Sequence, residues 1–173
     1  MTRFNLAISA GATVLTLATT AFAGPQYIDR TGYAASGYDV VAYFDLDQTP
    51  VGMDQPAAIP GRADITADYN GATFAFSTEA NRDRFLANPA AFAPQYDGHC
   101  AYGVAQGSKV PANPNLWRVV DGKLYLNITP DVVDLWENDI PGNLTSSTAN
   151  WVSLDPKPAA RSRIPKFKSA APN

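Results

Sequence analysis

The chain has 173 residues, of which 46% are hydrophobic and 17% charged, so it can bury one core and is too short for two full domains. Of its 13 basic residues, five lie in the C-terminal tail and one near the N-terminus, which leaves seven against all 16 acidic residues in residues 24–156. This acidic central part excludes nucleic-acid binding by the domain, because phosphate contacts require clustered Lys and Arg.

Residues 1–23 are typical of a Sec-type signal peptide. Arg3 precedes an apolar run that is diluted by Ser, Gly and Thr and that ends in the small-x-small triplet at residues 21–23. Because the run is short for a membrane span, we expect cleavage after Ala23 and no transmembrane segment in the mature chain. We therefore expect a periplasmic or secreted protein, in which the single cysteine, Cys100, excludes an intramolecular disulfide.

A first β-hairpin is predicted around the Asn-Gly pair at residues 70–71. Apolar and aromatic residues alternate on both sides of this pair, and Asn-Gly fits a type I′ turn. A helix follows, which Ser77 or Thr78 can cap and which Pro89 ends, with Phe85 facing the core.

A second hairpin is predicted around the Asp-Gly pair at residues 121–122, with strands over 116–120 and 123–128. The next helix opens at Thr129-Pro130 and carries an apolar stripe, and Pro141-Gly142 is expected to end it. A final helix is predicted over 146–154.

The segment between the two halves is rich in Gly and Pro, and short helical turns are expected there from Asp97 onward. The hairpin-helix order occurs twice, but the two halves share no residue-level match. We therefore predict one small α+β domain over residues 24–156, with antiparallel β-hairpins packed against short helices. A flexible, basic, Pro- and Ala-rich tail is predicted over 157–173.

The stretch "ADYNGATFAFSTEANRDRFLANPAAFA" resembles the core of the YHS domain, a small module often linked to heavy-metal handling. In that family a Tyr-x-Gly hairpin leads to Tyr-x-Phe-Cys-Ser-x-x-Cys and then to a helix ending in Phe-x-x-x-Pro and an aromatic residue. The matching positions are Tyr69, Gly71, Phe74, Phe76, Phe85, Pro89 and Phe92. Upstream, "GYDVVAYF" resembles the family's Asp-Pro-Val-Cys-Gly-Met opening, with Asp39 and Val41 kept. The resemblance implies a YHS-like fold.

The cysteines of the metal-binding YHS proteins are replaced in this chain. At their positions the sequence has Ala42, Ser77 and Asn81, whose side chains supply no thiolate. A multi-cysteine site at these positions is therefore excluded, and any metal needs a relocated site.

The segment "YDGHCAYG" offers such a site, because it places the only histidine, His99, beside Cys100. Adjacent side chains point in different directions in regular structure, so joint binding of one ion requires an irregular backbone, which Gly98 permits. Met53 is a candidate third ligand. Copper is favoured over zinc, because Cu(I) accepts two or three ligands whereas structural zinc usually requires four. The predicted metal ligands are thus His99, Cys100 and Met53, and copper or, second, zinc is the predicted ion.

Two other functions stay open. The segment around His99 can instead fill the space between the hairpins of a degenerate module that recognises a periplasmic protein or a small ligand. Candidate contact residues are then Tyr27, Tyr33, Tyr38, Tyr43 and Tyr69. The third function is a thiol-based redox sensor or enzyme, in which a helix N-terminus lowers the pKa of Cys100. Because the chain lacks established catalytic motifs, we expect a non-enzymatic protein.

Overall fold

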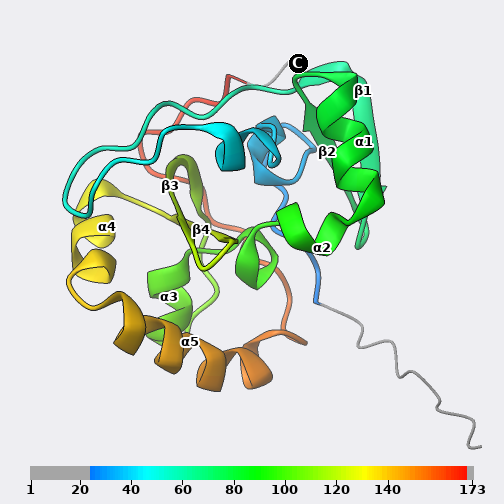
Figure 1. Cartoon of the computed structure of the whole chain (residues 1–173). Helices are drawn as coiled ribbons and strands as arrows, with labels where there is room; N and C mark the ends of the chain where they lie inside the picture. Colours follow the sequence, from blue (N-terminus) through cyan, green and yellow to red (C-terminus); the bar gives the residue numbers. More distant parts are fainter. Residues whose placement is uncertain (1–23, 171–173) are drawn as a thin grey trace, which may run out of the picture.

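The computed structural model describes residues 24–170, so the predicted signal peptide and the last three residues lie outside the described part. The chain forms a small α+β domain with two two-stranded antiparallel sheets, which confirms the predicted fold class (Figure 1). In chain order, the elements are η1 (Ala35–Gly37), η2 (Ala42–Asp45), β1 (Arg62–Tyr69), β2 (Ala72–Phe76), α1 (Glu79–Ala87), α2 (Pro89–Phe92), η3 (Gln95–Gly98), α3 (Ala101–Ala105), β3 (Asn113–Val120), β4 (Lys123–Asn127), α4 (Pro130–Glu137) and α5 (Ile140–Leu154).

The first hairpin, β1–β2, has the predicted turn. Asn70 and Gly71 adopt φ angles of 49° and 74°, the left-handed conformation that a type I′ turn requires. Phe74 and Phe76 on β2 are fully buried, and their rings lie 4.9 and 5.1 Å from the ring of Phe85 on α1. This aromatic group joins the hairpin to its helix and forms one side of the core.

The second hairpin, β3–β4, also has the predicted turn, with Asp121 and Gly122 at φ angles of 49° and 70°. The end of the next helix differs from the prediction, because residues 141–142 open α5 instead of ending α4. Proline is tolerated in the first turn of a helix, and the Asp139 side chain accepts a hydrogen bond from Gly142 N at 3.0 Å. α5 therefore begins at Ile140, earlier than the predicted residue 146.

The two halves of the domain repeat one backbone pattern. In each half an eight-residue strand pairs with a five-residue strand, and the register shifts after the first residue pair. The helix that follows begins after a threonine of nearly the same conformation, with φ and ψ of −139° and 155° at Thr78 and of −138° and 159° at Thr129.

A left-handed turn precedes each half of this repeat. Residues 35–37 have φ angles of 46°, 52° and 79°, and residues 96–98 have φ angles of 56°, 53° and 75°. Consecutive non-glycine residues in this region are unusual, so the shared turn is a strong mark of correspondence. It makes Asp39 and Cys100 equivalent, because each lies two residues after the turn's glycine. The domain is thus an internal repeat at the level of the backbone.

The C-terminal segment 157–170 packs along the domain in place of the flexible extension that we expected. Ala160 N donates to His99 Nε2 at 3.1 Å, Ile164 is buried, and the ring of Phe167 lies 6.3 Å from that of Tyr38. Ala170 N donates to the Tyr38 hydroxyl at 3.2 Å. Ile164 and Phe167 thus extend the core, although the high Pro and Ala content of the tail predicted a flexible segment.

Within residues 24–170, no helix combines the length and the apolar character needed to cross a bilayer.

Candidate functional site

The left-handed turn of η3 supplies the irregular backbone predicted beside His99. The imidazole is fully buried, and its Nδ1 lies 2.8 Å from the carbonyl oxygen of Tyr96. Because a carbonyl only accepts, Nδ1 carries the proton, and Nε2 accepts the hydrogen bond from Ala160 N. Burial lowers the pKa of His99 to about 4, so the ring is neutral at neutral pH. Both ring nitrogens are therefore already bonded to the protein.

Cys100 caps the N-terminus of α3. Its Sγ accepts from Gly103 N and donates to Asn127 Oδ1, both at 3.4 Å, and the same Asn127 oxygen accepts from Tyr102 N at 3.1 Å. Burial raises the pKa of the thiol. This direction is opposite to the one that a nucleophilic or redox-sensing thiolate requires.

Met53 lies apart from the other two predicted ligands. It is 59% exposed and lines a surface cavity that neither His99 nor Cys100 lines, whereas both of those residues are fully buried. Among residues 24–170, no group of three or more His, Cys, Asp and Glu side chains is arranged to hold a metal ion. Metal binding by His99 and Cys100 thus needs the hydrogen bonds of both side chains to break.

Ala42, Ser77 and Asn81 come together around the carboxylate of Asp39. Asp39 is fully buried, and its Oδ1 accepts from Val41 N at 3.0 Å and Ala42 N at 3.2 Å. Its Oδ2 accepts from Ser77 N at 2.8 Å, Ser77 Oγ at 2.6 Å and Asn81 Nδ2 at 2.7 Å. Five donors therefore hold one carboxylate, and the cluster is satisfied without an ion.

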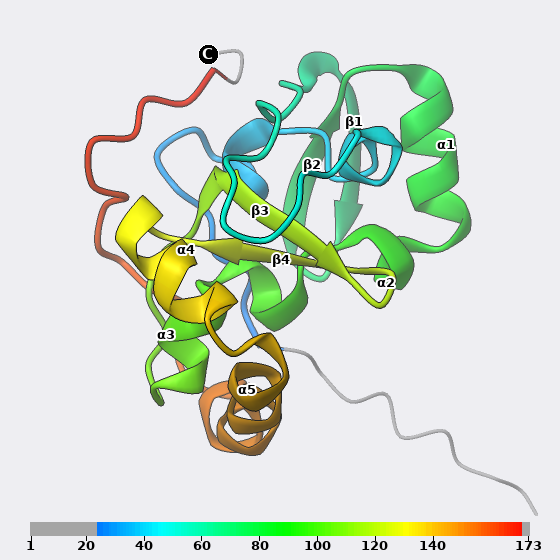
Figure 2. The ribbon, with the colours of Figure 1, turned by 60° about the vertical axis from the view of Figure 1, so that its left-hand side comes forward.

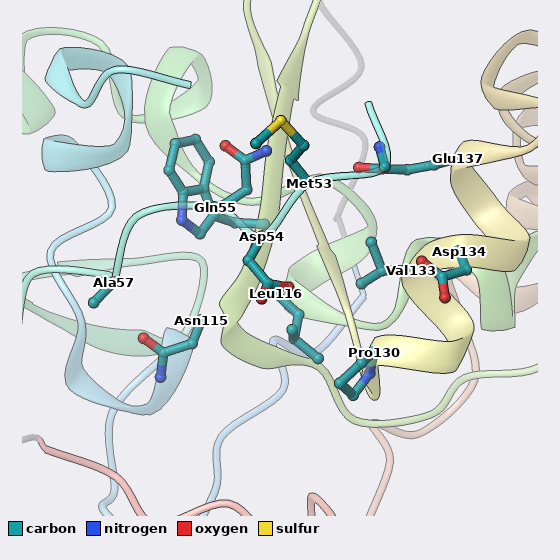
Figure 3. A pocket seen from close by; sticks show the side chains of 12 residues that line it. Met53, Asp54, Gln55, Ala57, Asn115, Leu116, Pro130, Val133, Asp134 and Glu137 are labelled. Carbon is teal, nitrogen blue, oxygen red and sulfur yellow. The ribbon is translucent and has the colours of Figure 1, made fainter. Parts of the chain in front are cut away.

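A cavity of about 360 Å³ lies between the loop over residues 47–57, β3 and α4 (Figure 3). Met53, Leu116, Trp117 and Val133 supply its apolar surface. Its acidic residues are Asp54, Asp134 and Glu137, and none of the described residues that line it is basic. Sequence reasoning missed this site except for Met53, since its walls come from three segments far apart in the chain.

A buried ion pair holds the loop in place over the cavity. Arg118 Nε donates to Glu137 Oε1 at 2.6 Å, and the two side chains are only 5% and 4% exposed. The guanidinium also donates to the carbonyl oxygens of Thr49 and Pro50 at 3.0 and 3.2 Å, and Glu137 Oε2 accepts from Gly52 N at 2.6 Å. The cavity is therefore formed before any ligand arrives.

The same pair decides the charge of the cavity. Arg118 neutralises Glu137, whereas Asp54 and Asp134 are exposed to solvent. The Trp117 indole nitrogen donates to Pro56 O at 2.8 Å, so the indole is fixed by the opposite end of the loop. An apolar floor and two exposed carboxylates suit a cationic group on an apolar body.

Comparison of the chain with protein-family models, with curated proteins and with solved structures found no match.

The tyrosines predicted as contact residues are mainly part of the core. Tyr27, Tyr38 and Tyr43 are 4%, 3% and 1% exposed, and only Tyr33 and Tyr69 are partly accessible. The Tyr43 hydroxyl donates to Pro114 O at 2.8 Å, and burial raises its pKa well above the usual value. A tyrosine can be buried when its hydroxyl group finds a hydrogen-bond partner. The sequence alone therefore does not distinguish a buried tyrosine from an exposed one.

Proposed function

We propose that the protein is an exported, non-enzymatic, YHS-like binding module whose cavity between the 47–57 loop, β3 and α4 takes a ligand. The observation that carries this proposal is the preformed cavity of about 360 Å³, which falls in the range of small-molecule sites. The convergence of Ala42, Ser77 and Asn81 on Asp39 supports the YHS resemblance, because positions related by that motif also meet in space. The signal-like N-terminus supports export.

The expected ligand carries a positive charge next to an apolar part, as an aliphatic amine or the Lys or Arg side chain of a partner protein does. Asp54 and Asp134 attract the charge, and Leu116, Trp117 and Val133 contact the apolar part. Each exposed carboxylate contributes about 0.2–1 kcal/mol, so removing both should weaken binding by roughly two- to thirtyfold.

Three six-carbon probes test this proposal: hexylamine, hexanol and hexanoate. In NMR titrations, hexylamine should shift the resonances of Leu116, Trp117 and Val133, hexanol should bind more weakly, and hexanoate weakest. Asn at both Asp54 and Asp134 should remove the preference for the amine. A matched Asp68→Asn change on β1, outside the cavity, should leave it unchanged.

Two outcomes overturn the proposal. Equal shifts with hexylamine and hexanol refute the role of the carboxylates. An absence of shifts at β3 and α4 with every probe refutes the cavity as a ligand site.

Copper binding by His99 and Cys100 stays a separate prediction. The two side chains are adjacent and buried, but each is engaged by hydrogen bonds within the protein. The cavity needs no such rearrangement to take a ligand.

A further inference from the structure

Gly24, the first residue after the predicted cleavage point, is held tightly inside the domain. It is buried, and its backbone nitrogen donates to Asp155 Oδ1 at 2.6 Å. Its carbonyl oxygen accepts from Asn70 Nδ2 at 3.3 Å. A Cβ atom at this position would overlap the backbone carbonyl of Asp155, so only glycine fits. Figure 2 shows the described chain beginning beside α5, whose C-cap is Asp155.

A second carboxylate lies at the same place with an oxygen to spare. Asp97 is only 8% exposed, and its Oδ1 accepts from Gln26 Nε2 at 2.8 Å and from Asn70 Nδ2 at 3.5 Å. Because the Asn70 amide also bonds the Gly24 carbonyl, Asp97 and Gly24 are neighbours. Asp97 neighbours the Asp155 carboxylate, and its Oδ2 has no hydrogen-bond donor among the residues that the structure describes. A buried carboxylate oxygen without a hydrogen bond destabilises the fold, so a further donor at this position would be favourable.

We propose that hydrolysis of the Ala23–Gly24 bond creates the missing donor: the new α-ammonium of Gly24 binds Asp155 and Asp97 and locks the mature N-terminus into the domain. In the hydrolysis, the peptide C–N bond breaks, water adds its hydroxyl to the Ala23 carbonyl carbon, and the Gly24 nitrogen gains protons to become –NH₃⁺. This inference rests on the proposed export, because it requires cleavage at that bond.

The chemistry of the site favours an ammonium over an amide. An amide offers one hydrogen, which Asp155 Oδ1 accepts, whereas an ammonium offers three hydrogens and a positive charge. The charge also lies at the C-terminal end of α5, where the helix dipole favours cations.

Among the described residues, the one base near the two carboxylates hydrogen-bonds to backbone carbonyls instead of to either carboxylate. Lys109 is the nearby base, and its Nζ donates to the carbonyl oxygens of Asp155 and Lys157 at 3.0 and 2.9 Å. With the N-terminus in amide form, burial and the neighbouring Asp155 raise the pKa of Asp97 to about 7, although Lys109 opposes the shift. The two carboxylates thus repel each other until a cation lies between them.

The test compares two forms of the chain that begins at Gly24, one with a free α-amine and one with an acetylated α-amine. Acetylation should raise the unfolding equilibrium constant about tenfold or more in urea titrations at pH 7, the change that one unit of α-amine pKa shift implies. In the Asp155→Asn background the two forms should differ by less than about twofold. The matched Asp83→Asn change, at an exposed carboxylate, should leave the tenfold difference intact.

A second readout does not depend on how well the variants fold. In carboxyl NMR titrations, Asp97 should titrate near pH 7 in the acetylated chain and well below that in the chain with the free amine. Equal stability of the two chains together with the same Asp97 titration overturns the inference. A secreted protein whose mass places its first residue anywhere but Gly24 also overturns it. Neither result depends on the cavity at α4, so failure there and failure here are separable.

Discussion

Replacing Asp39 by Asn tests the carboxylate cluster in the first half of the repeat. The change keeps the shape of the side chain but replaces one of its acceptor oxygens by an NH₂ group. Whichever way the amide is turned, this group faces backbone N–H donors, either of Val41 and Ala42 or of Ser77. At least one or two buried donors then lose their acceptor, at about 1–3 kcal/mol each, so the loss of unfolding free energy should be about 3–5 kcal/mol. Domains of this size unfold with about 5–15 kcal/mol, so the variant should be only marginally stable.

The assay is urea and thermal unfolding of the mature chain at pH 7. The midpoint of thermal unfolding should fall by roughly 6–20 °C in Asp39→Asn. Asn81→Ala removes one of five donors and should cost only about 1 kcal/mol. Asp83→Asn, at an exposed carboxylate paired with Arg82, should stay within about 0.5 kcal/mol of the native protein. An Asp39→Asn variant as stable as Asp83→Asn refutes the reasoning.

His99, the Arg118–Glu137 pair and Cys100 each carry a further prediction. The folded-state pKa of His99, about 4, lies below the unfolded value of about 6.5, so the unfolded state binds a proton first as the pH falls. The free energy of unfolding should therefore fall by about 2–3 kcal/mol between pH 6.5 and pH 4. His99→Gln should remove this contribution to the pH dependence in urea titrations. Glu137→Gln leaves the buried guanidinium of Arg118 without its charged partner and should lower the free energy of unfolding by about 3–5 kcal/mol, with faster proteolysis of the loop over 47–57. The matched change Asp64→Asn, at an exposed ion pair, should leave both measurements unchanged. The metal hypothesis predicts Cu(I) binding under reducing conditions that Cys100→Ser abolishes, and unchanged binding in that variant refutes the site.

Local turn chemistry explains why the hairpins were predictable. The pairs at residues 70–71 and 121–122 are among the few that tolerate two successive left-handed residues, so each determines a turn almost by itself. The start of α5 was missed because Pro141-Gly142 reads equally well as the end of one helix and the start of the next. The hydrogen bond from Gly142 N to the Asp139 side chain shows that the pair starts a helix.

The cavity could not be predicted from the sequence, for a different reason. Its loop is held by Arg118 and Glu137, which are distant from that loop in the chain, and no short-range pattern relates them. Met53 was predicted as a metal ligand because of its sulfur, whereas in the structure it contributes apolar surface to the cavity. The two left-handed turns were equally hidden, because residues 35–36 and 96–97 are not the Gly or Asn that usually reveal a positive φ.

The ion pair that anchors the loop over 47–57 has no counterpart at the equivalent positions of the first half. Counted from Thr78 and Thr129, the residues equivalent to Arg118 and Glu137 are Ala67 and Leu86, and Leu86 is 54% exposed. These apolar side chains lack the groups that bind backbone oxygens and amides, so the loop over 47–57 has no comparable anchor on α1.

The polar cluster shows the reverse distribution. The residues equivalent to Ser77 and Asn81 are Ile128 and Val132, which pack against the core, and Cys100 takes the place of Asp39. In the first half, therefore, the hydrogen bonds of a buried carboxylate join turn, hairpin and helix. In the second half the apolar side chains of Ile128 and Val132 replace two of these hydrogen-bonding groups, and Glu137 on α4 binds the loop instead. Since the same backbone supports both arrangements, the difference between the half built around Asp39 and the half that carries the cavity lies in a few buried charged side chains.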